Sequence, residues 1–206
     1  MDAQAWDARY RDADLVWSKG PNLFVEAEVA DLPPGRALDL AGGEGRNAIW
    51  LAQRGWDVEL VDFSEVALEK ARRLAAHAGV RLATTRADLV AAAGGDAAPA
   101  LERADLVLVV YLQLPREELA PVLAFAADRT RPGGTLLVVS HARRNLVDGV
   151  GGPPDPAVLT EPGELVAHLE GTGLVIDRTG EVLRPVETDE GLRDAIDALV
   201  RAHRPT

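Results

Sequence analysis

The chain has 206 residues, a formal net charge of −11 and no cysteine, with 47% hydrophobic and 27% charged residues. This profile is that of a soluble globular domain large enough to bury a core. The negative charge opposes binding to nucleic acid, and the lack of cysteine excludes disulfides, thiolate nucleophiles and cysteine-ligated metals. The longest apolar run, residues 106–112, is too short to span a bilayer, and the charged first residues do not form a signal peptide. We therefore expect a cytoplasmic protein with neither a membrane nor a nucleic-acid partner.

Two short helices are predicted ahead of the first strand, over residues 2–11 and 22–30. The first helix places Trp6 and Tyr10 four residues apart on one face, and Trp17 lies in the loop between the helices. Either the three aromatic side chains simply anchor the segment to the core, or Tyr10 and Trp17 pack against a bound ligand.

A cluster of glycines follows the first predicted strand, residues 37–40. Gly43, Gly45 and Ala48 satisfy the G-x-G-x-x-G/A pattern of dinucleotide-binding sites. Small residues permit a tight turn and a close approach of ligand to backbone, and the N–H groups of the next helix point at that ligand. The pattern predicts a nucleotide-type site but does not identify the nucleotide.

Two acidic residues distinguish between candidate ligands. Asp39 lies inside the first strand and Glu44 lies within the turn, where both would repel a pyrophosphate. The same carboxylates favour a ligand that carries an ammonium and a sulfonium group, as S-adenosylmethionine does.

The next two strand ends also carry acids. Asp62 ends a strand over residues 58–61 and is placed to accept hydrogen bonds from both ribose hydroxyls of either kind of nucleotide. Phe63 would lie near the adenine. A third strand, residues 80–86, is followed by Asp88, which can accept a hydrogen bond from the adenine amine, and by an apolar residue placed against the ring, Leu89.

The second half of the chain contains the remaining elements of an α/β sheet. A central strand, residues 105–110, leads to Tyr111, and we expect a mobile loop before it at residues 90–100. Residues 195–204 are compatible with a helix by propensity or with a strand. The other predicted elements are a helix at 115–130, a turn at 131–134, a strand at 135–140, a loop at 141–161, a helix at 162–171 and a strand at 174–183.

The segment LDLAGGEGRNAIWLAQRGWDVELVDFS, residues 38–64, resembles the first two motifs of class I S-adenosylmethionine-dependent methyltransferases. Within it, GEGRNAIWLA and RGWDV are similar to the tellurite-resistance and thiopurine methyltransferase-like branch. One departure is Ala41-Gly42-Gly43, where that branch usually has Gly-Cys-Gly. An Asn/Asp-Pro-Pro-aromatic signature, typical of adenine- and amide-directed enzymes, is absent after the fourth strand.

The resemblance implies a Rossmann-like, doubly wound α/β fold with seven strands in the order 3-2-1-4-5-7-6. It also implies that residues 195–204 form an antiparallel seventh strand and not a helix. We expect one methyltransferase domain over residues 1–206, with a helical lid segment at 1–35 and the Rossmann-like core at 36–206.

The resemblance also implies S-adenosylmethionine as cofactor, with S-adenosylhomocysteine as product, and a small-molecule methyl acceptor. A soft nucleophile such as a thiol or a selenium or tellurium species fits the branch, and the acidic surroundings disfavour a polyanionic acceptor. The residues expected to bind the cofactor are Tyr10, Trp17, Asp39, Ala41, Gly42, Gly43, Gly45, Asp62, Phe63, Asp88, Leu89 and Tyr111.

Three residues are candidates for catalysis. His141 follows the fifth strand at the binding edge and is the best-placed base or acceptor contact. Arg46 follows the glycine turn and could hold a carboxylate, and Tyr111 is placed to face the methyl group. The loop at residues 141–161 is the expected cover of the acceptor site. No residue spacing predicts a metal site.

Two other functions remain open from the sequence. The glycine turn and Asp62 also fit an NAD(P)-dependent oxidoreductase. A protein that binds S-adenosylmethionine without catalysis would keep the same cofactor residues.

Overall fold

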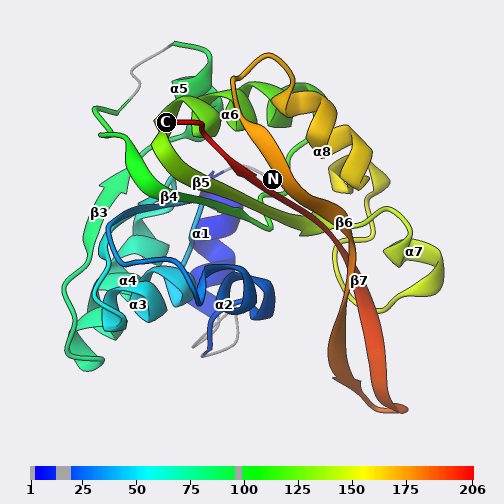
Figure 1. The fold of residues 1–206 in the computed structure, drawn as a ribbon. Coiled ribbons are helices and arrows are strands. Elements are labelled where there is room, and N and C mark those ends of the chain that lie inside the picture. The colour runs from blue at the N-terminus through cyan, green and yellow to red at the C-terminus, as the bar shows by residue number, and fades with distance from the viewer. Residues whose placement is uncertain (1–2, 13–19, 96–98) are drawn as a thin grey trace.

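The core of the molecule is a seven-stranded sheet in the order β3-β2-β1-β4-β5-β7-β6 (Figure 1). The computed structural model describes residues 3–12, 20–95 and 99–206. The first five strands are parallel, and β7 runs antiparallel to both of its neighbours, as predicted. The strands are β1 (Arg36–Leu40), β2 (Asp57–Asp62), β3 (Ala83–Arg86), β4 (Ala104–Val110), β5 (Thr130–His141), β6 (Val175–Thr188) and β7 (Gly191–His203).

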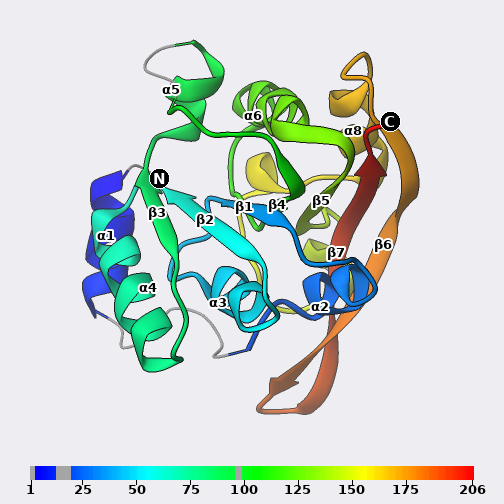
Figure 2. The ribbon, with the colours of Figure 1, turned by 60° about the vertical axis from the view of Figure 1, so that its left-hand side comes forward.

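Helices cover both faces of the sheet (Figure 2). One face carries α2 (Leu23–Val29), α3 (Arg46–Gln53) and α4 (Glu65–His77), and α1 (Ala3–Asp12) packs against α4. The other face carries α5 (Leu89–Ala93), α6 (Arg116–Arg129) and α8 (Pro162–Leu169). The predicted doubly wound α/β arrangement is therefore confirmed.

Alternate residues of the central strands supply the two cores. Leu38 and Leu40 of β1 pack into the cluster beneath α6 and α8. Ala37 belongs to the cluster beneath α2, α3 and α4, together with Leu108. Because side chains alternate along a strand, Asp39 faces this second, apolar cluster. A carboxylate thus occupies a position that the pattern of the sheet would otherwise give to an aliphatic residue.

Side-chain caps explain where several helices begin. The side chain of Asn22 accepts from the N–H groups of Phe24 and Val25 at the start of α2. Ser64 Oγ accepts from the N–H of Ala67 at 3.1 Å at the start of α4. Each cap satisfies N–H groups that have no partner inside the helix.

The expected mobile loop at residues 90–100 is wrong in its first part, where α5 forms. Asp88 Oδ1 accepts from the N–H groups of Val90 and Ala91, and Leu89 and Ala92 are buried. An N-cap acid followed by apolar residues was the available signal, but the nearby glycines suggested a loop. The third strand is also shorter than expected, since it begins at Ala83.

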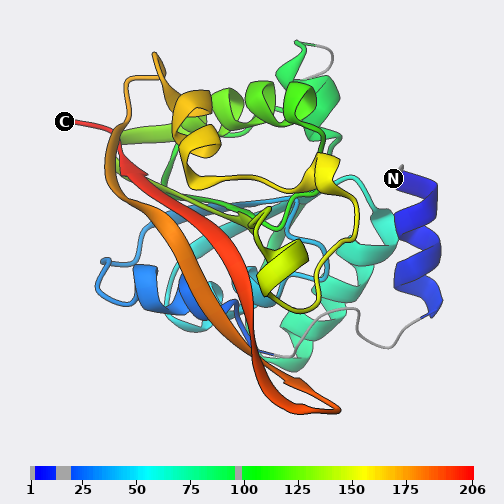
Figure 3. The same ribbon diagram turned by 90° about the vertical axis from the view of Figure 1, so that its right-hand side faces the viewer.

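The last two strands are much longer than predicted. They stay paired from Val175↔His203 to Thr188↔Gly191, so a hairpin arm extends beyond the rest of the sheet (Figure 3). Strand β5 is also longer, because it includes the residues predicted as a turn at 131–134. The arm was missed because its tip is polar and pairs only with itself.

The segment predicted as a structureless loop at 141–161 is partly ordered. It contains α7 (Asn145–Asp148) and a 3₁₀ turn, Pro156–Val158, and Ala142 pairs with Thr160. Within the described ranges of the chain, no helix has the length and apolar character needed to cross a membrane.

Asn145 fastens this segment to the sheet. Its Oδ1 accepts from the N–H of Ile196 in β7 at 2.7 Å, and its Nδ2 donates to the carbonyl of Gly151 at 2.7 Å. The side chain is 4% exposed, and a Cβ atom added to Gly149 would lie 1.9 Å from Asn145 Oδ1. Asn145 therefore fixes the path of the chain through residues 149–152.

We predict that Asn145→Ala lowers the free energy of unfolding by about 2 to 3 kcal/mol, because it leaves the buried N–H of Ile196 without an acceptor. Limited proteolysis should cut faster near residues 149–154. The control Leu146→Ala removes an exposed neighbour and should change stability by less than about 0.5 kcal/mol. Equal stability of the two variants in urea denaturation would contradict the role of Asn145.

Candidate active site

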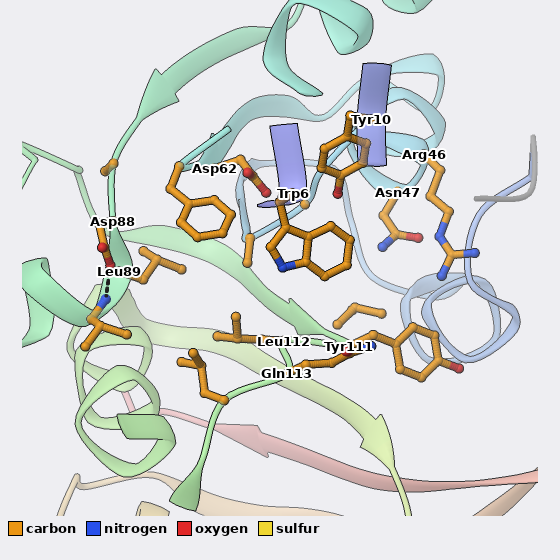
Figure 4. Close-up of a pocket in the computed structure, with 17 residues that line it drawn as sticks. Trp6, Tyr10, Arg46, Asn47, Asp62, Asp88, Leu89, Tyr111, Leu112 and Gln113 are labelled. Atoms are coloured by element: carbon orange, nitrogen blue, oxygen red, sulfur yellow. Dashed lines mark hydrogen bonds between the residues drawn. The ribbon is translucent and has the colours of Figure 1, made fainter. Parts of the chain in front are cut away.

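The carboxyl ends of β1, β2 and β4 converge on a pocket (Figure 4). We call it the strand-end pocket. In a parallel sheet, ligands bind at this edge, where neighbouring connections leave in opposite directions. The predicted site residues that line it are Tyr10, Ala41, Gly42, Arg46, Asp62, Phe63, Asp88, Leu89 and Tyr111.

The turn after β1 is shaped by a close approach of the backbone to side chains beneath it. A Cβ atom at Gly42 would lie 2.3 Å from Leu60 Cδ1 and 2.6 Å from Asp39 Oδ2, so only glycine fits. Gly43 and Gly45 have φ values of 57° and 78° and are buried. These two glycines shape the turn but, unlike Gly42, are not among the residues that line the pocket, and their expected contact with the cofactor stays a prediction.

Ala41 has the left-handed backbone conformation, with φ of 56°. A non-glycine residue there is strained by contact between its Cβ and the backbone. The position is the first of the three where the methyltransferase branch usually has Gly-Cys-Gly. Tyr111, at the end of β4, has φ of 58°, so two strained residues flank the pocket.

Asp39 lies below the turn and is not among the residues that line the pocket, so its expected role in cofactor binding stays a prediction. The residue is fully buried, and neither carboxylate oxygen has a hydrogen-bond partner within the described part of the chain. Burial raises the pKa of Asp39 to about 7, against the opposing effects of the backbone N–H of Ala48 and the charge of Arg46. A buried carboxyl group without a partner fits a site for a cation directly above Gly42.

Asp62 is held in place by the turn itself. Its Oδ2 accepts from the N–H of Gly43 at 2.9 Å, and its Oδ1 accepts from the N–H of Ser64 at 2.9 Å. Burial raises the pKa of Asp62, with a further contribution from Asp7, although these N–H groups act in the opposite direction. Each oxygen retains acceptor capacity toward the pocket.

Glu44 has a different role from the one expected. Its carboxylate is 2% exposed and forms an ion pair with Lys70 Nζ of α4 at 3.1 Å. The sequence argument used Glu44 as a second acid that repels a pyrophosphate, and this pairing removes that contribution. The electrostatic preference for a cationic ligand therefore depends on Asp39 and Asp62.

Helix α1 forms one wall of the pocket through Trp6 and Tyr10, whose ring centres are 5.5 Å apart. Trp6 extends into the space between Asp62 and Leu112 (Figure 4). The free volume of the pocket is about 100 Å³, which is below the 300–1,000 Å³ of common ligand sites. The sequence had assigned Trp6 only an anchoring role. Trp17 lies outside the described residues.

A second cavity of about 900 Å³ adjoins the first and shares Arg46, Tyr111 and Gln113 with it. We call it the arginine cavity. Its other walls come from the 150–154 loop, which Asn145 fixes, and from the base of the hairpin arm. Arg9, Arg46 and Arg184 line it, and none of the described lining residues is acidic. This corrects the expectation of acidic surroundings for the acceptor.

Four side chains from distant parts of the sequence form one network at this cavity. Asp197 Oδ1 lies 3.1 Å from Nδ1 of His141, and its Oδ2 accepts from the hydroxyl of Tyr111 at 2.7 Å. Arg184 Nε donates to Asp197 Oδ2 at 2.9 Å and to the Tyr111 hydroxyl at 3.0 Å. The rings of Tyr111 and His141 stack with their centres 4.3 Å apart.

The network gives Asp197 a stable negative charge. Burial works against ionisation, but hydrogen bonds from His141, Arg184 and Tyr111 hold the pKa of Asp197 below its ordinary value. Burial and the nearby Asp197 raise the pKa of Tyr111, which keeps its hydroxyl protonated. Asp197 and Arg184 were not predicted. An acid inside the apolar strand Ile196–Ala202 was the one signal for Asp197.

The fold and the strand-end pocket define a Rossmann-like protein with a nucleoside site at the switch point of the sheet. Residues 37–134 match the family described as a methyltransferase domain. In sequence, the chain is 32% identical over 138 residues to the tRNA 5-carboxymethoxyuridine methyltransferase of Escherichia coli K12, covering 65% of this chain and 49% of that protein.

Two solved structures show the same fold. One comes from work on the conversion of a disulfide bond into a thioacetal group during echinomycin biosynthesis, with a TM-score of 0.78, 25% identity, and coverage of 98% of this chain and 91% of that one. TehB from Haemophilus influenzae has a TM-score of 0.73 and 21% identity, with coverage of 98% and 66%. It is described as a probable S-adenosyl-L-methionine-dependent methyltransferase.

Residues 37–134 thus match a methyltransferase domain, and the resemblance of the chain to class I S-adenosylmethionine-dependent methyltransferases, TehB among them, is confirmed. S-adenosylmethionine is the cofactor of this family. The chain spans between 37% and 49% of the length of the curated relatives it matches.

The residues of the strand-end pocket fit this cofactor on two observations. Asp39 is a buried carboxyl group without a hydrogen-bond partner among the described residues, and it lies beneath a turn whose Gly42 leaves the backbone open to close approach. The ammonium and sulfonium groups of the cofactor supply the positive charge that this carboxyl lacks. No cluster with metal-ligand character occurs in the described ranges, and the absence of a metal remains a prediction.

We predict that Ala41→Gly raises the free energy of unfolding by about 1 kcal/mol, because glycine adopts positive φ without steric cost. The control Ala52→Gly, in the ordinary helix α3, should lower it by about 1 kcal/mol. Chemical denaturation of both variants checks the prediction, and a loss of stability for Ala41→Gly would contradict it.

The raised pKa of Asp39 has a consequence for stability. Between the unfolded value, 3.8, and the folded value, about 7, the folded state binds more protons than the unfolded state. Stability must therefore fall as pH rises through this window and then level off above about pH 7. An asparagine side chain cannot ionise, so the free energy of unfolding of Asp39→Asn should not show this fall. Its difference from wild type should therefore increase by up to about 1.4 kcal/mol for each pH unit between 3.8 and about 7. Urea denaturation between pH 5 and 8 measures the difference, and a constant difference would contradict the assignment.

Proposed function

We propose that this protein transfers a methyl group from S-adenosylmethionine, bound in the strand-end pocket, to a small molecule bound in the arginine cavity. The observation that carries the proposal is the adjacency of the two spaces. Apart from Trp6 and Tyr10, the residues that line the pocket lie in the segment that matches a methyltransferase domain, and the pocket meets a cavity of about 900 Å³ at Arg46 and Tyr111. Such an arrangement brings a donor and an acceptor together at one edge of the sheet.

The residues have separate roles in this proposal. Asp62 accepts from the ribose hydroxyls, Asp88 and Leu89 contact the adenine, and Asp39 stabilises the positive charge above Gly42. Asp88 already uses Oδ1 to cap α5, so its Oδ2 is the oxygen left for a ligand. The cofactor supplies an activated methyl group, so the protein mainly aligns the partners and excludes water.

The choice of a small-molecule acceptor is supported by the size of the arginine cavity, about 900 Å³, and by the overall charge of the chain. A net charge of −11 opposes the binding of a polyanion such as tRNA, although one relative is a tRNA methyltransferase. The structural neighbour from echinomycin biosynthesis is associated with chemistry at a disulfide. Sulfur is therefore the first acceptor atom to test.

Two other functions would use the same fold. An NAD(P)-dependent oxidoreductase would place a pyrophosphate against the glycine turn, above the buried carboxyl group of Asp39, which is unfavourable. A non-catalytic binding protein would have no need for a second cavity with an ordered histidine. Both alternatives are distinguished by the ligand and by the product.

We predict that S-adenosylmethionine and S-adenosylhomocysteine raise the melting temperature, by roughly 5 to 10 °C at one hundred times the Kd, and that NAD and NADP do not. Asp62→Asn should weaken S-adenosylhomocysteine binding about 10-fold or more, because one ribose acceptor is lost. The control Glu69→Gln changes an exposed acid of α4 and should bind like wild type. Stabilisation by NAD or NADP alone would overturn the proposal.

Methyl transfer itself is checked by mass spectrometry after incubation with a panel of thiols, phenols and amines. Binding of S-adenosylmethionine without any methylated product would favour the non-catalytic function. Methylation of tRNA alone would replace the small-molecule acceptor.

A further inference from the structure

The arginine cavity has the opposite charge character from the protein as a whole. The chain carries a net charge of −11, yet three arginines and no acidic residue line this cavity within the described part of the chain. Among the described residues, the carboxylate of Asp197 lies next to this cavity, but it is fully buried behind the lining and is paired with Arg184, His141 and Tyr111. The described lining therefore offers a ligand arginine side chains and no carboxylate.

Arg184 has donors left for a ligand. Its Nε is used by Asp197 and Tyr111, while neither Nη1 nor Nη2 has a hydrogen-bond partner among the described residues. The side chain is 26% exposed, and the guanidinium lies with its Cζ 5.6 Å from the centre of the Tyr111 ring. Asp197 thus fixes the orientation of a planar group whose remaining N–H groups can pair with a carboxylate.

His141 is oriented by the same carboxylate. Because its Nδ1 faces Asp197 at 3.1 Å, the neutral ring carries its proton on Nδ1, and Nε2 keeps a lone pair. Stacking on Tyr111 fixes the plane of the ring. The charged and titratable groups around the ring are Asp197 of β7, Arg184 of β6, Tyr111 after β4 and, across the Tyr111 ring, Arg46 of α3.

We infer that the methyl acceptor is a small anion with two functional ends. One end is a carboxylate or a similar group that pairs with Arg184, and the other is a neutral O–H or S–H that gives its proton to Nε2 of His141. Asp197 is a positioning residue that sets the ring tautomer and the orientation of the guanidinium. The inference rests on the proposed function and names the substrate class and the base of that same site.

The transfer step balances as follows. A lone pair on the acceptor oxygen or sulfur forms the bond to the methyl carbon, and the carbon–sulfur bond of the sulfonium breaks with its electron pair going to sulfur. The acceptor proton passes to His141 Nε2. The resulting imidazolium is stabilised by the negative charge of Asp197, which is ionised before the step.

The first test measures binding in the presence of S-adenosylhomocysteine, which blocks turnover. The probes are 4-hydroxybenzoate and 4-mercaptobenzoate, each compared with its neutral amide by calorimetry. We expect the benzoates to bind at least 10-fold more tightly than the amides, as a charge-assisted hydrogen bond provides. Arg184→Gln should abolish most of this preference, whereas Arg193→Gln, on the outer hairpin arm, should keep it.

The outcomes distinguish failure of the anionic acceptor from failure of the proposed methyltransferase function. Equal affinity for benzoates and amides, or no benzoate binding while S-adenosylhomocysteine binds, overturns the anionic acceptor and leaves the proposed function standing. Failure of S-adenosylhomocysteine itself to bind overturns the proposed function, and this inference with it.

The second test examines His141 without requiring activity. Nitrogen-15 NMR of the four histidines should include a signal from a ring with a proton on Nδ1 and a lone pair on Nε2 that is lost in His141→Gln and kept in His203→Gln. His203→Gln is the matched control, because His203 also pairs with an aspartate, Asp177 at 2.7 Å, but lies on the surface. A proton on Nε2 of neutral His141 would overturn its role as base.

Kinetics give the third readout, with 4-hydroxybenzoate as acceptor. His141→Gln should lower kcat by about 100-fold or more, and it should remove the rise of kcat/KM with pH that accompanies deprotonation of this histidine. His203→Gln should retain both the rate and the profile. An unchanged profile in His141→Gln would overturn the assignment.

Discussion

The absence of space for a side chain at Gly42 is the constraint on which the rest of the site depends. Backbone, Leu60 and Asp39 meet there so closely that a single added carbon would collide with both side chains. This contact sets the path of the turn, and the turn in turn directs the N–H of Gly43 to Asp62. This steric constraint therefore places one carboxyl group, Asp39, below the turn and a second, Asp62, at the wall of the pocket.

Asp197 has a comparable role on the other side of Tyr111. It connects residues that leave the sheet from β4, β5 and β6, and it does so from a position inside the apolar strand β7. An unpaired carboxylate there would be costly to bury, so the three donors are needed for the fold as well as for chemistry. Tyr111 joins the two halves of the site, since it lines both the strand-end pocket and the arginine cavity.

Much of the fold could be predicted from the sequence because its signals are local. The glycine turn, the acids at the ends of β1, β2 and β3, and the caps at Asn22 and Ser64 are read within a few residues. Misjudged features depend on contacts between distant segments. Lys70 neutralises Glu44, α5 forms where glycines suggested a loop, and the hairpin arm extends because β6 and β7 pair with each other.

The sequence by itself determined the order of elements, the nucleoside site and the family resemblance, since periodicity and short motifs encode them. Only the tertiary structure decided that Asp39 lies beneath the pocket, that Trp6 extends into it, and that a positive cavity adjoins it. It also brought together Tyr111, His141, Arg184 and Asp197, of which the first and the last are 86 positions apart in the sequence. The physical reason is that these contacts depend on strand register and packing across the sheet, which no local pattern specifies.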